Sequence, residues 1–178
     1  MRIVAGEYKY RKIAIPDDIR PTTEKVREAV CSMFMPYISQ ARVLDLFAGS
    51  GVMGLELLSR GASHCTFNEI DRNHLRILRD NIRNCGAGSR SEVCNRDYRK
   101  LLETVDEPFD IIFLDPPYTS GFYEDALDLI AERKLLSEDG VVVAEHLYDK
   151  ILSDNYRDLT RIKCKKYGTI GVDVFCVR

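Results

Sequence analysis

The sequence predicts an α/β fold: a mostly parallel sheet of seven strands with an antiparallel C-terminal strand, preceded by an N-terminal β-hairpin and helix. Three observations predict it. Short apolar runs alternate with amphipathic stretches from residue 42 onward, which is typical of strand–helix–strand crossovers and parallel strands. A glycine-rich segment follows the first run, where a strand turns into a helix. Two apolar runs near the C-terminus flank a turn with glycines, which indicates a closing antiparallel hairpin.

The first forty residues are expected to form an extension ahead of the alternating region. Residues 2–8 and 11–15 are predicted to be two short strands of a hairpin. After a polar loop, Thr23 is a typical N-cap for a helix, and Pro36 indicates that this helix ends nearby. Apolar residues at helical spacing predict that the helix buries one face; they are Val26, Val30, Met33, Phe34 and Tyr37.

The alternating region assigns the remaining elements in order. Strands are expected at residues 42–47, 64–69, 91–95, 109–114 and 140–145. Helices are expected at residues 51–60, 72–84, 97–104, 121–133 and 147–155. Residues 159–167 and 172–177 are expected to form the closing hairpin. A length of 178 residues fits one domain, with residues 1–40 as the extension and residues 41–178 as the core that carries the site.

The composition argues against several classes of protein. No apolar stretch approaches the roughly 18 residues of a membrane span, and the N-terminus lacks the apolar segment of a signal peptide, so we expect a cytoplasmic protein. The six cysteines show no C-x-x-C spacing and no neighbouring histidines that would complete a zinc pattern. We therefore expect reduced cysteines packed as small hydrophobic residues, and no metal site.

Positive charge gathers at both ends of a chain whose net charge is −2. Residues 1–12 hold four basic residues against Glu7 alone, and residues 157–178 hold six against Asp158 and Asp173. Both ends could meet a polyanion such as nucleic acid. An equally good interpretation is that lysines on a solvated strand edge prevent aggregation.

The segment Asp45–Gly54 contains the pattern G-x-G-x-x-G between an apolar run and a helical one. Glycines there allow a tight turn and a close approach of the backbone to a ligand at the helix N-terminus. Glu69 lies twenty residues after Gly49, at the end of the next strand, where a carboxylate can accept hydrogen bonds from ribose hydroxyls. This combination indicates a nucleotide-like cofactor, and it fits both NAD and S-adenosylmethionine.

Three features favour S-adenosylmethionine. Asp45 precedes the glycines, where a carboxylate would repel a pyrophosphate but suits the ammonium of a methionine moiety. Asp97 follows the third parallel strand and could accept a hydrogen bond from an adenine amino group. The chain also has no second domain to hold a hydride acceptor. Structural roles stay open for both carboxylates, Asp45 as a brace of the loop and Asp97 as an N-cap, and both kinds of role can coexist.

The apolar run 109–114 ends in Asp115-Pro116-Pro117-Tyr118, so this motif lies at the carboxyl edge of a strand, where open α/β sheets bind ligands. The carboxylate and a proline carbonyl could accept the two N–H bonds of an exocyclic amine, and the tyrosine ring could stack on the plane that carries it. The prolines fix φ and supply carbonyls with no competing N–H. A plain turn is the alternative, because Asp-Pro commonly starts turns.

Together these motifs resemble a class I S-adenosylmethionine-dependent methyltransferase of the amino-methylating type, which has a Rossmann-like fold. The segments that carry this resemblance are Leu44–Gly54, Glu69, Asp97 and Asp115–Tyr118. The segment Arg20-Pro-Thr-Thr-Glu-Lys-Val-Arg-Glu28 resembles a narrower family, the bacterial RsmD group of 16S rRNA guanine-N2 methyltransferases. The resemblance extends to Lys166-Tyr167-Gly168 and covers essentially the whole chain. Where the family usually has a Gly-Arg pair, this chain reads Lys9-Tyr10-Arg11-Lys12, so the hairpin tip is expected to contact RNA differently.

The resemblance implies roles for individual residues. Those implied to bind S-adenosylmethionine are Asp45, Phe47, Gly49, Gly51, Glu69, Ile70 and Asp97. Asp45 would lie near the ammonium, Glu69 at the ribose, and Ile70 and Asp97 at the adenine. Those implied to be catalytic are Asp115, Pro116, Pro117 and Tyr118, with the first two gripping the guanine N2 and the tyrosine stacked on the base. Those expected to contact RNA are Arg2, Lys9, Arg11, Lys12, Arg20, Thr22, Lys165 and Lys166.

The implied substrate is a guanine of 16S rRNA within a partly assembled small subunit, and the implied enzyme is a monomer with no obligate protein partner and no membrane association. The nearest alternative is a DNA adenine-N6 or cytosine-N4 methyltransferase, because the Asp-Pro-Pro-Tyr motif specifies an amine and not a base. A protein glutamine amide is a rival substrate, though that chemistry resembles Asn-Pro-Pro-Tyr. A non-catalytic RNA-binding protein on the same fold and an NAD oxidoreductase complete the alternatives.

Overall fold

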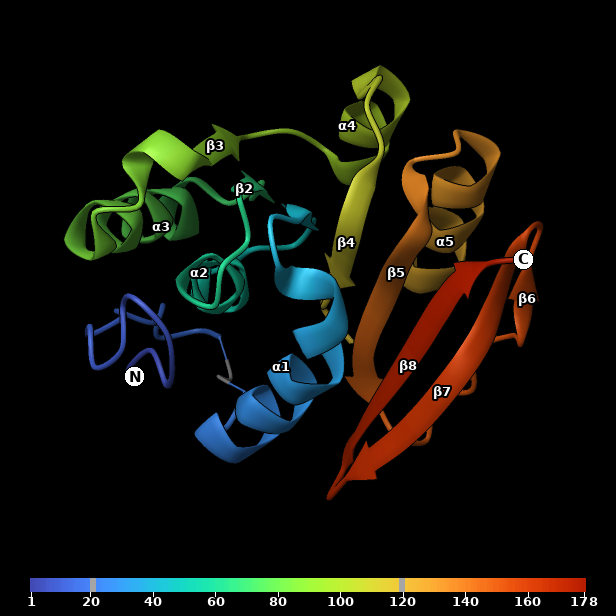
Figure 1. The fold of residues 1–178 in the computed structure, drawn as a ribbon, viewed down its shortest axis with the longest axis horizontal. Coiled ribbons are helices and arrows are strands. Elements are labelled where there is room, and N and C mark those ends of the chain that lie inside the picture. The colour runs from blue at the N-terminus through green and yellow to red at the C-terminus, as the bar shows by residue number, and fades with distance from the viewer. Residues whose placement is uncertain (20–21, 119–120) are drawn as a thin grey trace.

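The computed structural model describes residues 1–19, 22–118 and 121–178 (Figure 1). Its helices are α1 (Glu24–Ile38), α2 (Val52–Ser59), α3 (Arg72–Cys85), the 3₁₀ turn η1 (Gly88–Arg90), α4 (Tyr98–Thr104) and α5 (Phe122–Glu132). Its strands are β1 (Arg42–Asp45), β2 (His64–Asn68), β3 (Ser91–Cys94), β4 (Phe109–Leu114), β5 (Leu136–Leu147), β6 (Asn155–Tyr156), β7 (Leu159–Tyr167) and β8 (Ile170–Val177). Arg20, one of the residues expected to contact RNA, lies outside the described residues.

The strands form one sheet in the order β3-β2-β1-β4-β5-β8-β7-β6. Strands β1 to β5 pair in parallel, and the C-terminal strands pair antiparallel. The expected α/β fold with a mostly parallel sheet is therefore confirmed. Over the described residues the sheet has eight strands instead of seven, because the two-residue β6 adds to its edge.

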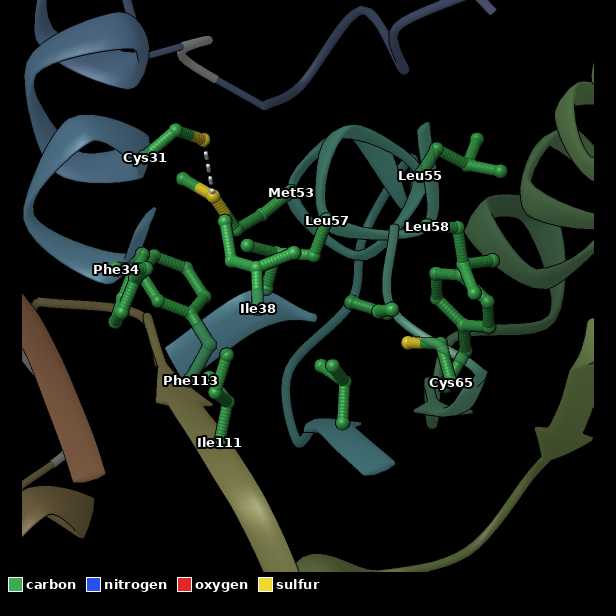
Figure 2. Packing of buried hydrophobic residues seen from close by; sticks show 14 of the residues in the cluster. Cys31, Phe34, Ile38, Met53, Leu55, Leu57, Leu58, Cys65, Ile111 and Phe113 are labelled. Atoms are coloured by element: carbon green, nitrogen blue, oxygen red, sulfur yellow. Dashed lines mark hydrogen bonds between the residues drawn. The ribbon is translucent and has the colours of Figure 1, made fainter. Parts of the chain in front are cut away.

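Alternate residues of the central strands face two helical layers. On β4, Ile111 and Phe113 join the core under α1, α2 and α3, whereas Ile112 and Leu114 join the core under α4 and α5. Figure 2 shows the first core from close by, with Phe34 of α1 lying against Phe113. Such burial on both faces explains why the central strands read as continuous apolar runs. No helix in the described part of the chain has the length and apolar character needed to cross a membrane.

The N-terminal segment does not form the expected hairpin of two strands. Its pairing is reduced to a single antiparallel bridge between Arg2 and Lys12 around a wide turn. The backbone N–H of Glu7 instead donates to the carbonyl of Ser59 at 2.8 Å, and that of Tyr8 donates to the Ser59 hydroxyl at 2.8 Å. The segment therefore packs on the end of α2 while it keeps a short antiparallel pairing, in which the N–H of Ile3 donates to the carbonyl of Arg11 at 3.0 Å and that of Ile13 donates to the carbonyl of Met1 at 2.8 Å.

A buried ion pair ties this segment to the helices. Arg27 of α1 and Glu56 of α2 are fully buried, with Nε and Oε1 3.1 Å apart. The same carboxylate accepts the backbone N–H of Val4 at 2.7 Å, and the guanidinium donates to the carbonyl of Arg2 at 2.6 Å. A buried ion pair is tolerated when further hydrogen bonds satisfy its remaining donors and acceptors. The backbone partners of Arg27 and Glu56 supply such bonds.

The helix expected at residues 147–155 is wrong. Strand β5 continues to Leu147, which pairs with Ile170 of β8, and the turn is held by a bond from the Tyr148 N–H to the Thr169 carbonyl at 2.9 Å. The antiparallel ladder thus takes Leu147, residues 148–154 form a turn and irregular chain that leads to β6, and Ile151 is left 87% exposed. The closing hairpin of β7 and β8 is confirmed.

Gly54 provides a test of how tightly α2 packs on the sheet. A Cβ there would lie 2.3 Å from Phe67 Cε1 and 2.7 Å from Cys65 Sγ of β2. We expect Gly54→Ala to lower the free energy of unfolding by about 1–3 kcal/mol through overpacking, as measured by denaturant titration. Gly88→Ala is the control, because nothing lies within 4 Å of a Cβ at that position. Equal stability of the two variants would contradict the packing described.

Candidate active site

A cleft of about 630 Å³ lies at the carboxyl ends of β1, β2 and β4. The four residues of the Asp-Pro-Pro-Tyr motif line it, together with six of the seven residues expected to bind a cofactor: Asp45, Phe47, Gly49, Glu69, Ile70 and Asp97. Segments far apart in the sequence therefore meet at one edge of the sheet, as expected for an open α/β fold.

Gly51 is not among the residues that line this cleft. It is the N-cap of α2 with a φ of 77°, a conformation that favours glycine, and a Cβ there would lie 2.3 Å from Leu78 Cδ1. Gly51 therefore lies on the side of the loop that packs against Leu78 of α3, while Gly49 lies at the cleft surface. The ring of Phe47 forms part of the wall, with its centroid 5.3 Å from that of Tyr98.

Asp45 is buried at the end of β1, and its Oδ2 accepts the N–H of Gly54 at 3.1 Å. Burial raises the pKa of this carboxyl to about 7, and the nearby charge of Glu69 contributes to the rise. The expected brace of the glycine loop is thus present. The raised pKa also indicates that the ionised carboxylate lacks compensation inside the protein and would gain from a cationic ligand.

Glu69 and Asp97 both have structural partners in addition to lining the cleft. Glu69 accepts the N–H of Gly49 at 2.8 Å with Oε2 and that of Asp71 at 2.8 Å with Oε1. Asp97 is the N-cap of α4 and accepts the N–H of Arg99 at 3.0 Å. Ile70 lies beside them and is 63% exposed, so an apolar surface is open to a flat ligand.

Asp115 follows β4 directly, and its pKa is raised well above the usual range. Burial is the main cause, and the carboxyls of Glu145 and Asp45 raise it further. Glu145 is a residue that the sequence reading missed. It lies near the end of β5, is 1% exposed, and accepts the Thr22 hydroxyl at 2.7 Å. The available signal was a carboxylate that ends the apolar run 140–144 at the carboxyl end of a strand.

A second hollow of about 510 Å³ continues from the cleft, and we call it the β5 hollow. Thr22 and Tyr118 line both cavities, so the two meet at the Asp-Pro-Pro-Tyr motif. Glu145 and Lys166 line the β5 hollow as well. The arrangement can hold one ligand in the cleft and a second in the hollow, with Tyr118 lining both cavities and Asp115 on the cleft side.

The residues of the cleft fit S-adenosylmethionine and do not fit a dinucleotide. The carboxyls of Asp45 at the end of β1 and Asp115 directly after β4 line the cleft, and Glu145 lies near the end of the neighbouring β5. Burial raises the pKa of each of the three. A pyrophosphate would add negative charge to this edge. The ammonium and sulfonium groups of S-adenosylmethionine would instead compensate it.

The basic residues expected to contact RNA fall into two groups. Arg2, Lys9, Arg11 and Lys12 are exposed on the N-terminal segment, and they line neither the cleft nor the β5 hollow. Lys165 and Lys166 lie on β7, and Figure 1 shows this strand and the N-terminal segment on opposite sides of α1. Lys166 lines the β5 hollow, with Nζ 4.1 Å from the centroid of the Tyr148 ring.

Comparison with known proteins gives consistent results. The family model described as "Conserved hypothetical protein 95" matches residues 1–176. The chain is 37% identical to "Putative rRNA methyltransferase YlbH" of Bacillus subtilis, over 98% of both chains. It is 34% identical to "Ribosomal RNA small subunit methyltransferase D" of Haemophilus influenzae, over 98% of this chain and 93% of that one. The structure titled "Putative methyltransferase yhhF from Escherichia coli" superposes with a TM-score of 0.91 at 30% identity, covering 100% of this chain and 98% of that one.

Proposed function

This chain belongs to the RsmD family of ribosomal RNA methyltransferases, and on that basis we propose that it methylates the exocyclic N2 amine of a guanine in 16S rRNA. The methyl donor is S-adenosylmethionine. The observation that supports the proposal best is that the Asp-Pro-Pro-Tyr motif lines the acidic cleft and that its last residue, Tyr118, also lines the β5 hollow. A methyl donor in the cleft and a base in the hollow would meet at this motif.

The roles proposed for the cleft residues are those that the resemblance to the family implies, and their position in the cleft supports them. Asp45 would receive the ammonium of the donor's methionine part, on the backbone of Phe47 and Gly49. Glu69 would share its oxygens between the loop and the ribose, and the apolar surface of Ile70 with Asp97 would receive the adenine. When bound, S-adenosylmethionine supplies an activated methyl group on a positively charged sulfur.

The substrate amine requires activation, because the N2 lone pair of guanine is delocalised into the ring. Asp115 and the carbonyl of Pro116 would accept its two N–H bonds from outside the ring plane, which draws the nitrogen towards tetrahedral geometry. The attacking nitrogen must then lie at a near-attack distance of roughly 3–3.5 Å from the methyl carbon. A carboxylate at this place also stabilises the positive charge that develops on nitrogen. The alkylated ammonium is acidic enough to lose its proton to Asp115 or water.

We further propose that the substrate is a partly assembled small subunit and that the enzyme acts as a monomer. A domain of this size has little surface beyond the site for reading sequence, so the shape of the assembled particle would supply specificity. The basic residues of the N-terminal segment and of β7 would hold phosphates on either side of α1. If the target guanine is paired or stacked, it must be flipped out to reach the β5 hollow.

The test is transfer of a labelled methyl group from S-adenosylmethionine, followed by identification of the modified nucleoside. Small subunits that lack their native methyl groups, free 16S rRNA and duplex DNA are offered side by side. N2-methylguanosine from the subunit or its rRNA supports the proposal. N6-methyladenine or N4-methylcytosine in DNA would move the substrate to the nearest alternative, because the same motif can present either amine.

Tyr118 provides a narrower test of base stacking in this site. We expect Tyr118→Ala to weaken kcat/KM for the rRNA substrate by about 1–3 kcal/mol, the range for stacking of one base on an aromatic ring. Tyr118→Phe keeps the ring and should retain most of the activity. If both variants lose activity equally, the hydroxyl and not the stacking surface carries the effect.

A further inference from the structure

Glu145 is the buried carboxyl beside the Asp-Pro-Pro-Tyr motif whose partners are incomplete. Its Oε1 accepts the Thr22 hydroxyl at 2.7 Å. Its Oε2 is buried and has no hydrogen-bond partner among the residues described. A buried acceptor left without a donor costs free energy, so such an atom calls for an explanation. Glu145 lines the β5 hollow, which indicates that the missing donor comes from a ligand in that hollow.

The register of the sheet places this carboxyl beside Asp115. Leu114 of β4 pairs with Ala144 of β5, so Asp115 and Glu145 take the next position on neighbouring parallel strands. Adjacent strands lie about 4.8 Å apart, and equivalent positions point to the same face. The carboxyl of Glu145 also raises the pKa of Asp115, as expected for neighbouring acids. A base whose amine contacts Asp115 would therefore present the neighbouring part of its ring edge to Glu145.

We propose that Glu145 accepts the N1–H of the target guanine and thereby selects guanine over the other bases that carry an amine. This inference rests on the proposed guanine-N2 activity and assigns specificity within that site to a residue outside the Asp-Pro-Pro-Tyr motif.

The chemistry of the base edges carries the inference. Guanine presents two kinds of donor side by side, the N1–H and the N2 amine. Adenine and cytosine present their amine beside an unprotonated ring nitrogen, which is an acceptor. An ionised carboxylate can only accept, so it would be satisfied by guanine and repelled by the lone pair of the other two bases. The contact would be made by Oε2 alone, and leaving a buried acceptor of this kind unpaired with the wrong base typically costs a factor of about ten to a hundred.

The charge of the loaded site favours the ionised form of Glu145. In the ligand-free protein, burial raises the pKa of this carboxyl, while the Thr22 hydroxyl and His146 lower it. The positive charge of the methyl donor next to Asp115 and an arriving N–H from the base both favour the carboxylate. Thr22 would hold one oxygen in place and leave the other to face the base.

The experiment compares guanine with 2-aminopurine at the methylated position of 16S rRNA assembled into small subunits. 2-Aminopurine keeps the 2-amino group, but its N1 is an acceptor. We expect the wild-type enzyme to prefer guanine by at least tenfold in kcat/KM. Glu145→Gln can turn its amide N–H towards an unprotonated N1, so the preference should fall at least tenfold or invert. 2-Aminopurine also lacks the O6 atom of guanine. Because the wild type and the variant are compared on the same two substrates, any effect of the missing O6 is the same for both enzymes and drops out of the comparison.

A second readout does not depend on methyl transfer. 2-Aminopurine becomes more fluorescent when it leaves the base stack, so its binding can be titrated with the product S-adenosylhomocysteine present. Glu145→Gln should bind the analogue-containing subunit more tightly than the wild type does. The matched control is Glu138→Gln, the same change on an exposed residue near the start of β5, and it should keep the wild-type preference.

The outcomes separate this inference from the proposed function. If the wild type forms no N2-methylguanosine on any rRNA substrate, the proposed function fails. If it forms N2-methylguanosine but Glu145→Gln keeps the wild-type preference, the role of Glu145 is overturned. The glutamine variant should melt no lower than the wild type, since it removes a buried carboxyl. If it does not fold, Glu145→Asp replaces it and should lose activity while retaining the preference for guanine, and loss of that preference would count against the proposal.

Discussion

Asp115→Asn should reduce methyl transfer by at least 10²–10³-fold, the usual effect of removing one preorganised group that stabilises developing charge. The asparagine keeps the shape of the side chain but removes its negative charge and places an N–H where the amine must donate. Affinity for the cofactor product should stay within a few-fold, because the proposed function places Asp115 against the amine and not against the methionine part. Single-turnover transfer and calorimetric titration of S-adenosylhomocysteine measure the two quantities separately.

The same substitution should raise the melting temperature of the ligand-free protein. Burial and the carboxyls of Glu145 and Asp45 raise the pKa of Asp115, so its ionised form is destabilising at neutral pH. Asp106→Asn is the control, since this residue is exposed before β4 and should change neither activity nor stability. Equal losses of transfer and cofactor affinity in Asp115→Asn would move Asp115 from the substrate side to the cofactor side.

Asp45→Asn should weaken cofactor binding by about 1.5–3 kcal/mol, the contribution of a hydrogen bond to a charged group. The pH dependence gives the sharper result. The pKa of Asp45 is about 7 in the ligand-free protein, and the ammonium of the cofactor favours the ionised form. Binding below pH 7 must therefore release a proton, and wild-type affinity should fall as the pH is lowered. Calorimetry in buffers of different ionisation enthalpy should detect this release in the wild type and not in the variant.

Asp45→Asn should weaken cofactor binding but increase the free energy of unfolding of the ligand-free protein. A carboxyl whose folded pKa is raised from 3.8 to about 7 contributes stability that is full below pH 4 and is lost as the pH rises through 7. At pH 8 the asparagine should therefore stabilise the ligand-free protein by a few kcal/mol, on the order expected for such a shift. Near pH 4 the difference should vanish. Asp80→Asn on the exposed face of α3 serves as the control. If Asp45→Asn still released a proton on binding the cofactor, the titrating group would be a residue other than Asp45.

The sequence predicted those elements whose local pattern agrees with their tertiary setting. The run 109–114 matches β4 residue for residue, because a strand buried on both faces has no competing pattern. Residues 147–155 failed for the opposite reason. The expected helix gives way to the end of β5 at Leu147 and to a turn, because the pairing of β5 with β8 is non-local and leaves no trace within the segment. The N-terminal hairpin is present only as a short antiparallel pairing around Arg2 and Lys12, since contacts with Ser59 take up the backbone of Glu7 and Tyr8.

The candidate site likewise contains residues that a local sequence pattern identifies and a residue that only the tertiary structure identifies. The glycine loop and the Asp-Pro-Pro-Tyr motif each have a local signature, so both were found from the sequence, and the structure places them on one cleft. Glu145 has no such signature. Its significance arises from β5 lying next to β4 and from the register of that pair, which neither strand encodes alone. The N-cap role of Asp97, by contrast, could be expected from the sequence because an N-cap is a local feature.

The three carboxyls at the carboxyl edge of β1, β4 and β5 have a consequence for turnover under the proposed function. Methyl transfer converts the positively charged sulfonium of the donor into a neutral thioether. Asp45, Asp115 and Glu145 would therefore attract the spent cofactor less than the fresh one, although both share the same adenosine and amino acid. The acidic edge that assembles the reactants thus also favours exchange of product for donor, and each cycle would be directed forward by the loss of one charge.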